Sequence, residues 1–169
     1  KVFDAKGELV IDLKNTGLSN PRCFFVEEKD LLIVTSTFNS MATFVDLKKK
    51  KVMGQLANAE KDQFFLISSD LHYLGSKEFV KNIRFKYKNE MYGFEQFDAY
   101  LNQPHQVLRA FNCSDSALIK AYEKAYTKRL KVLGIKPGTK VNFVSLPNLH
   151  QKKMLGDKAG IASFGVSAN

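Results

Sequence analysis

The amino-acid sequence predicts a mainly β protein that carries a helical hairpin. Short apolar runs separated by turn residues fill the first 78 positions, which is typical of short strands. Apolar side chains then alternate from Ile83 to Tyr87, and from Phe94 onward their spacing becomes helical. We therefore divide the 169 residues into strands at 1–78, a β-hairpin and helical linker at 79–135, and a short β region or tail at 136–169.

The strands of the first segment are separated by turns of a few residues. Val2–Phe3 and residues 8–13 flank a turn at 4–7. The run "LLIVTST" is a continuous stretch rich in β-branched residues, which predicts a strand covered on both faces. A turn is expected at Phe38–Ser40. Four consecutive strands are expected near residues 22–26, 31–37, 41–47 and 51–56.

A four-stranded antiparallel meander of about 40 residues is the unit of a β-propeller blade. We therefore expect residues 22–56 to form one blade, Val2–Asn15 the outer edge of a preceding blade, and Phe64–Ser76 the first two strands of a following one. One blade and two part-blades cannot close a ring, which needs roughly four to eight. Either the remaining blades belong to sequence outside this chain, or these strands form a different small sheet. We favour the first alternative and therefore expect this chain to be a piece of a longer protein.

The third strand of the expected blade ends in the run "FVDLKKKKVMGQL". This run resembles the end of a WD-repeat blade, with Asp46 in the place of the aspartate of the Trp-Asp pair. Val45 stands where the tryptophan would be, and the whole chain contains no tryptophan. The resemblance therefore implies a degenerate WD repeat.

A strand at Ile83–Tyr87 and a hairpin around Lys88–Glu90 precede two expected helices. Pro104 suits the first turn of a helix at 104–111, with Asn102 or Gln103 as its cap. Ser114 or Asp115 would cap a second helix that runs to residue 133 and ends at Gly134.

The second helix carries a stripe of apolar side chains that we expect to be buried. Its lysines fall on the opposite face and are expected to be solvated. An isolated helix of this length is marginal in water, so the stripe should pack on the first helix or on the strand region before it. The stripe consists of Leu118, Ile119, Tyr122, Ala125, Tyr126, Leu130 and Leu133.

The run "FEQFDAYLNQPHQVLRAF" and the later "LIKAYEKAYTKRLKVLGI" carry a second resemblance. They are similar to the segment after the propeller in bacterial proteins that fuse a WD-repeat propeller to a caspase-like cysteine peptidase. The likeness extends from Ile67 to Ile135. It implies a helical linker clasped to the last blades and then a small β region, here with strands at Val141–Leu146 and Ile161–Val166. Gln103 and His105 stand where that family commonly has arginine and aspartate.

A caspase-like peptidase needs a histidine in a His-Gly turn and a cysteine after a buried strand. None of the three histidines is followed by glycine: we expect His72 in a strand, His105 at a helix start and His150 in a loop. Cys23 and Cys113 match neither a zinc nor a disulfide pattern and are expected to be buried small hydrophobes. We predict no catalytic, cofactor-binding or metal-binding residues, and no cofactor, in this chain.

The net charge of +9 is spread along the chain rather than concentrated in one motif. The leading hypothesis is a non-catalytic scaffold whose partner is another protein or the remaining blades. One alternative is a basic nucleic-acid or anion-binding module, which the charge favours. Another is a subunit of a cysteine peptidase whose catalytic residues lie outside this chain. No apolar run reaches the ~20 residues that a membrane-spanning helix needs.

Overall fold

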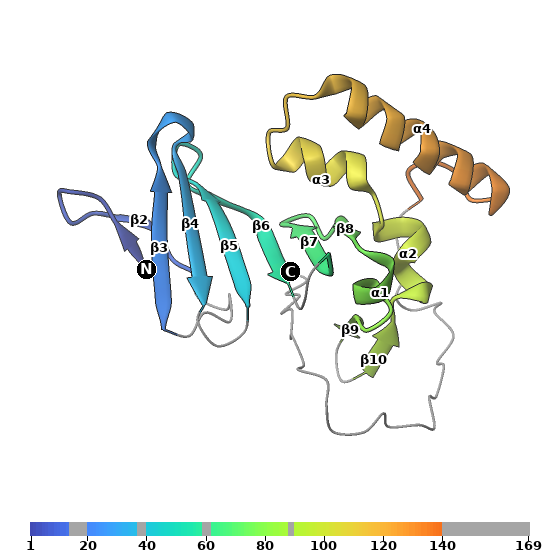
Figure 1. Ribbon diagram of the computed structural model, residues 1–169, viewed down its shortest axis with the longest axis horizontal. Helices are drawn as coiled ribbons and strands as arrows, with labels where there is room; N and C mark the ends of the chain where they lie inside the picture. Colours follow the sequence, from blue (N-terminus) through green and yellow to red (C-terminus); the bar gives the residue numbers. More distant parts are fainter. Residues whose placement is uncertain (14–19, 37–39, 59–61, 88–89, 140–169) are drawn as a thin grey trace.

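The computed structural model describes residues 1–13, 20–36, 40–58, 62–87 and 90–139. Within these ranges the protein is mainly β, with ten strands in antiparallel sheets and four α-helices, as Figure 1 shows. The predicted strands at 141–146 and 161–166 and the tips of the turns near residues 38 and 88 lie outside the described residues. No helix in the described part is long and apolar enough to cross a membrane.

The main sheet is one antiparallel meander in which each strand pairs with its neighbour in sequence, in the order β3-β4-β5-β6-β7-β8. All four strands expected between residues 22 and 56 are confirmed within a few residues. A 3₁₀ turn, Glu27–Lys29, joins the first two of them. The strands are β3 (Pro21–Val26), β4 (Leu31–Ser36), β5 (Met41–Asp46), β6 (Lys51–Asn58), β7 (Phe64–Ser68) and β8 (Tyr73–Gly75).

The prediction that residues 64–76 open a separate following blade is wrong. β7 pairs with β6 in register from Gly54↔Ser68 to Asn58↔Phe64, so the sheet continues without a break. Consecutive strands joined by a short connection favour direct antiparallel pairing. The prediction assumed four strands per blade and therefore placed a blade boundary after β6. The same sheet instead continues with β7 and β8.

The first two strands form a separate small sheet that packs on the main one. β1 (Val2–Phe3) pairs with β2 (Leu9–Ile11), as expected. The Asp4 carboxylate closes the predicted turn by accepting hydrogen bonds from the backbone N–H groups of Lys6 and Glu8, each at 2.9 Å. Val2 and Ile11 then pack against a buried cluster of Leu32, Val34 and Val45 in β4 and β5.

β4 is covered mainly on one face, and not on both as its sequence predicted. Leu32, Val34 and Ser36 are buried, whereas the residues that alternate with them are only half-buried. The sequence of β4 therefore predicted a strand correctly, but it predicted more burial than the structure shows. The β1–β2 hairpin covers the buried face, since the cluster of Leu32, Val34 and Val45 packs against it.

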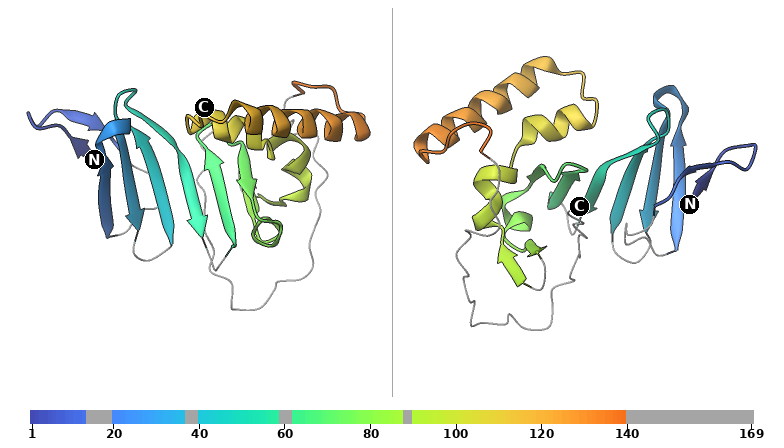
Figure 2. Two further views of the ribbon diagram at one scale, coloured as in Figure 1. Left: turned by 45° about the horizontal axis from the view of Figure 1, so that its top comes forward. Right: turned by 180° about the vertical axis from the view of Figure 1, so that it is seen from behind.

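The helices and a second hairpin gather at the β8 end of the sheet, as both views in Figure 2 show. A second hydrophobic cluster lies there, formed by Phe65, Ile67, Tyr73, Val80 and Ile83. The elements after β8 are α1 (Lys77–Val80), β9 (Arg84–Tyr87), β10 (Glu90–Gly93), α2 (Glu95–Leu101), α3 (Pro104–Ala110) and α4 (Ser116–Val132).

The two predicted helices are present as α3 and α4. Pro104 opens α3, and the Asp115 carboxylate caps α4 by accepting the backbone N–H of Leu118 at 2.9 Å. Gly134 follows α4 with φ +67°, the left-handed conformation expected after a helix. α2 and α1 add two helical segments whose separate bounds the sequence pattern did not resolve.

The predicted apolar stripe of α4 is only partly buried, which corrects the expectation that the whole stripe is covered. Leu130 is buried and Tyr122 and Tyr126 are half-buried, but Leu118 and Leu133 remain exposed. The reason is that α4 packs on α3, a helix of two turns, while α3 in turn contacts β7 and β8. A short helix covers only part of a longer one.

Candidate interaction surface

The main sheet has one open edge, formed by β3. This strand pairs with β4 from Pro21↔Ser36 to Val26↔Leu31 and has no strand on its other side in the described part of the chain. An unpaired strand presents backbone N–H and C=O groups that another strand can bind. Proteins usually block such edges with charge, proline or a bulge. Here Pro21 and Arg22 protect only the first end, and the residues from Cys23 to Val26 are uncharged.

Large apolar side chains surround this edge. Phe24 and Phe25 are 54% and 56% exposed, and because they are consecutive in a strand they point to opposite faces of the sheet. Phe3 and Leu9 of the β1–β2 hairpin are also about half exposed. Single exposed apolar residues are ordinary, but a group of them along an unpaired strand marks an interaction site. We call β3, with its exposed Phe24 and Phe25 side chains, the open edge.

The opposite edge of the sheet is closed by the helices. Tyr73 in β8 is fully buried and forms a parallel bridge with Asn102, the residue after α2. Val80 of α1 is buried in the same cluster as Phe65 and Tyr73. The two edges therefore differ: helices cover β8, whereas in the described ranges no strand pairs with the outer side of β3.

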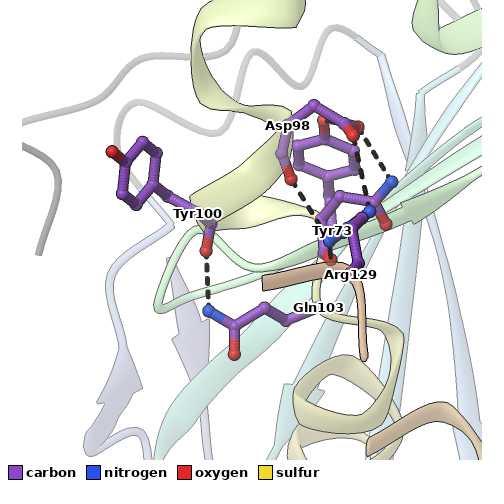
Figure 3. Close-up of polar contacts among 6 residues, drawn as sticks. Tyr73, Asp98, Tyr100, Gln103 and Arg129 are labelled. Carbon is purple, nitrogen blue, oxygen red and sulfur yellow. Dashed lines mark hydrogen bonds and ion pairs between the residues drawn. The ribbon is translucent and has the colours of Figure 1, made fainter. Parts of the chain in front are cut away.

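A polar network fastens the helices to β8, and Figure 3 shows its side chains converging on Asp98 of α2. The Asp98 Oδ1 atom accepts hydrogen bonds from the Tyr73 hydroxyl and from the Asn102 Nδ2 group, each at 2.8 Å. Arg129 of α4 approaches the Asp98 Oδ2 atom at 3.4 Å and also donates to the backbone carbonyl of Asn102. One carboxylate thus joins the sheet, α2 and α4.

The network keeps the Tyr73 hydroxyl protonated. Burial raises the pKa of this phenol far above its usual value, and the nearby Asp98 carboxylate raises it further. A phenol with a raised pKa remains a hydrogen-bond donor throughout the physiological range. The interaction is therefore structural: Tyr73 donates, Asp98 accepts, and no proton is released.

A close packing contact fixes the helices to the other part of the sheet. Phe111, which follows α3, lies edge-on to Phe44 of β5 with 5.3 Å between the ring centroids. A Cβ atom built on Gly54 of β6 would lie 2.9 Å from the Phe111 ring and would collide with the backbone carbonyl of Ile67. Gly54 thus provides the space into which the aromatic ring fits.

A cavity of about 480 Å³ lies between the segment from α2 to α3, α4 and the residues after α4. His72 and His105 both line it, together with Tyr126 and Glu123 of α4. His105 is 3% exposed, its ring centroid lies 5.2 Å from that of Tyr126, and its Nδ1 atom has no hydrogen-bond partner. Glu123 is held by an ion pair with Arg109 at 2.7 Å.

The lining of this cavity does not form a catalytic group. Burial lowers the pKa of both imidazoles, so each is neutral at pH 7. Among the described residues that line the cavity, none is a serine or a cysteine. In the described ranges no three His, Cys, Asp or Glu side chains gather closely enough to hold a metal ion. The histidines belong to the packing between β8, α3 and α4.

The buried histidines make the stability of the fold dependent on pH. We expect the free energy of unfolding to fall as the pH is lowered through about 6.5, the ordinary histidine pKa, because the unfolded chain then binds protons that the folded chain resists. Burial is the main cause of the lowered pKa of His105. The Glu123 carboxylate raises this pKa, whereas Arg109, His72 and Arg129 lower it further. Urea unfolding from pH 7.5 to 5 measures the effect.

His105→Gln provides the control for this pH dependence. Its stability profile should be flatter than that of the wild type over the same interval, since one titrating group is gone. Equal slopes in the two proteins would show that His105 does not titrate in this interval.

Asp46, the residue that resembles the WD-repeat aspartate, stabilises the turn after β5. It is buried, and its Oδ1 atom accepts the backbone N–H of Lys49 at 2.8 Å. That hydrogen bond lowers the pKa of the carboxyl group, and the Lys49 ammonium at 3.4 Å lowers it further. Asp46 therefore acts as a turn-closing acceptor at the end of β5.

The structure corrects two expectations about single residues. Cys23 is exposed on the edge strand β3 and is not a buried hydrophobe, while Cys113 is half-buried between α3 and α4. His72 lies just before β8 and not inside a strand. His105 is at the start of α3, as predicted. Sequence reasoning missed that His72 and His105 line one cavity, because no spacing pattern connects residues on different elements.

Comparisons of the chain with protein-family models, with curated proteins and with solved structures gave no match.

Proposed function

We propose that this chain is a non-catalytic protein-interaction segment of a propeller-type scaffold, and that it binds β-structured protein through its open edge. The observation that carries the proposal is the contrast between the two edges of the main sheet. Helices cover β8, whereas β3 has a paired strand on one side only among the described residues and carries Phe24 and Phe25 at more than half exposure. Addition of a strand to such an edge is a common mode of protein recognition.

The small β1–β2 sheet supports the finer interpretation as neighbouring propeller blades. It packs against the face of β4 and β5 and not against their edge, which is how successive blades meet. A two-stranded hairpin is marginally stable alone, so β1–β2 gains from further strands beside it. Those strands would cover Phe3 and Leu9.

The helical clasp, which we define as α2, α3 and α4, fits the linker of the proposed propeller and caspase-like parent. It seals the last strand of the sheet through the Asp98 network and leaves the opposite edge free. A linker built in this way would hold a following domain at a fixed place on the sheet. Catalysis would then belong to residues outside this chain.

The open edge is tested by self-association. Without its partner, the chain should pair through β3 at high concentration, because an uncharged apolar edge strand readily binds another copy of itself. Sedimentation equilibrium should detect dimers, and amide hydrogen exchange should show new protection in β3. The variant Phe24→Thr/Phe25→Thr keeps β propensity but removes the apolar surface, and it should remain monomeric.

Met91→Thr is the matched control for that variant. Met91 is equally exposed but lies on β10, away from the open edge. This protein should associate as the wild type does. Unchanged association of the phenylalanine variant, or protection confined to the helices, would contradict the proposed role of β3.

A further inference from the structure

The outward face of α4 is a second surface, distinct from the open edge. α4 lies beyond α3 on the side away from the sheet, as Figures 1 and 2 show, so its far side faces outward. Four apolar residues that fall close to one line along α4 are all exposed. Val132 is 80% exposed and Leu118 is 41% exposed. We call this line the outer seam; it consists of Leu118, Ala121, Ala125 and Val132.

The spacing of the outer seam is that of a coiled-coil contact line. Leu118, Ala125 and Val132 are seven residues apart, and Ala121 follows the first of them by three. These are the a and d positions of a heptad repeat, which face a second helix. Lys128 occupies the remaining d position. Ala121 and Ala125 have small side chains at i and i+4, which permit close approach of a neighbouring helix.

Basic residues flank the outer seam on one side. Lys124 and Lys131 hold the g positions of the same repeat, and both are exposed. In the part of the chain that the structure describes, neither has a carboxylate within ion-pair distance. The acidic residue of α4, Glu123, is already paired with Arg109 of α3. Lys124 and Lys128 are four residues apart and repel one another, so α4 alone gains nothing from this charge.

We propose that the outer seam of α4 binds an acidic amphipathic helix of a partner protein. Apolar side chains of the partner would cover the seam, and its glutamates or aspartates would pair with Lys124, Lys128 and Lys131. The lysines favour an anionic partner, and the heptad spacing of the apolar residues favours a helix among anionic partners.

Two other anionic partners fit this face less well. A nucleic acid would use the lysines but would leave the seam of Leu118, Ala121, Ala125 and Val132 in water. A lipid surface is bound by bulky apolar residues such as tryptophan, phenylalanine and leucine, whereas half of this seam is alanine. A helix uses both the small residues and the charge.

The test uses the full chain and a synthetic three-heptad helix with leucine at a and d and glutamate at e and g. The control peptide has lysine at e and g. Fluorescence anisotropy of the labelled peptides should show binding of the acidic peptide and at least tenfold weaker binding of the basic one. Chemical shifts of the bound chain should change along α4 and not in β3.

Two variants separate the helix from other anionic partners. Lys124→Glu/Lys131→Glu should lower the affinity for the acidic peptide about tenfold, because charge attraction is replaced by repulsion. The same variant should bind the basic peptide more tightly. Ala121→Gln/Ala125→Gln keeps the net charge and a similar helix propensity, but its larger side chains prevent close approach of a second helix at the outer seam. It should also lower the affinity for the acidic peptide about tenfold. Lys6→Glu/Lys77→Glu makes the same change in net charge elsewhere and should leave binding unchanged.

Binding of a random duplex DNA tests the alternative that this face of α4 is a general anion-binding site. If DNA binds more tightly than the acidic peptide, loses affinity in the lysine variant and is unaffected by the alanine variant, the face is an anion site and the proposal is wrong. Equal binding of the acidic and basic peptides would also overturn it. Neither result bears on β3, so this proposal and the proposed role of the open edge fail independently.

Discussion

Replacing Gly54 with valine should lower the free energy of unfolding by about 3 kcal/mol, the upper range for overpacking a closely packed site. The new side chain has no space, because its Cβ atom would meet the Ile67 carbonyl and lie 2.9 Å from the Phe111 ring. Backbone cannot move aside as the end of a flexible side chain can. We therefore expect β6 and β7 to separate or Phe111 to leave the sheet. Urea unfolding followed by circular dichroism measures the loss.

Gly93→Ala is the matched control for Gly54→Val. A Cβ atom on Gly93 would approach the Glu95 carboxylate at 2.6 Å, but that atom ends a mobile, exposed side chain that can rotate away. Its effect should stay within about 0.5 kcal/mol. If Gly54→Val were as stable as this control, the contact between Phe111 and β6 would not hold the helices in place.

Replacing Asp98 with alanine should lower the free energy of unfolding by about 2 kcal/mol. The change leaves three donors without their acceptor: the buried Tyr73 hydroxyl, the Asn102 amide and the Arg129 guanidinium. Breaking a fully buried ion pair costs roughly 3–5 kcal/mol, and the Asp98 and Arg129 side chains retain some contact with water, which reduces the loss. Thermal and urea unfolding give the value.

Two further variants test whether Asp98 is the centre of that network. Tyr73→Phe removes one donor and should cost about 1 kcal/mol. Glu95→Ala removes an exposed carboxylate from the same helix and should be nearly neutral. The double variant Asp98→Ala/Tyr73→Phe should cost less than the two single changes added together, since they remove one interaction. Additive costs would mean that the two groups are energetically independent.

Local patterns were enough to predict most of the elements. The strands β3 to β6, the turn at Asp4, and the helices α3 and α4 with their proline, Asp115 and Gly134 signals all follow from short-range chemistry. These features depend on residues within a few positions of each other. Where one side chain both starts an element and satisfies its backbone, as Asp115 does, sequence and structure agree.

Long-range packing could not be predicted in the same way. The burial of α4 depends on the length of α3, and the pairing of β6 with β7 depends on which partner each strand meets. The cavity joins His72 to His105 across 33 positions of sequence, and Asp98 joins Tyr73 to Arg129. No periodic pattern in the sequence predicts contacts between residues so far apart. Exposure of Phe24 and Phe25 likewise depends on the absence of a neighbouring strand from the described residues.

The two hydrophobic clusters lie at opposite ends of one sheet and have no buried residue in common. The two ends are connected by the backbone pairing of β6 with β7 and by the contact of the Phe111 ring with Phe44. The cooperativity of unfolding between the two ends therefore depends on this narrow junction. A force applied to the helices would reach β3 by the same route, so the junction sets how rigidly the helices are held relative to β3.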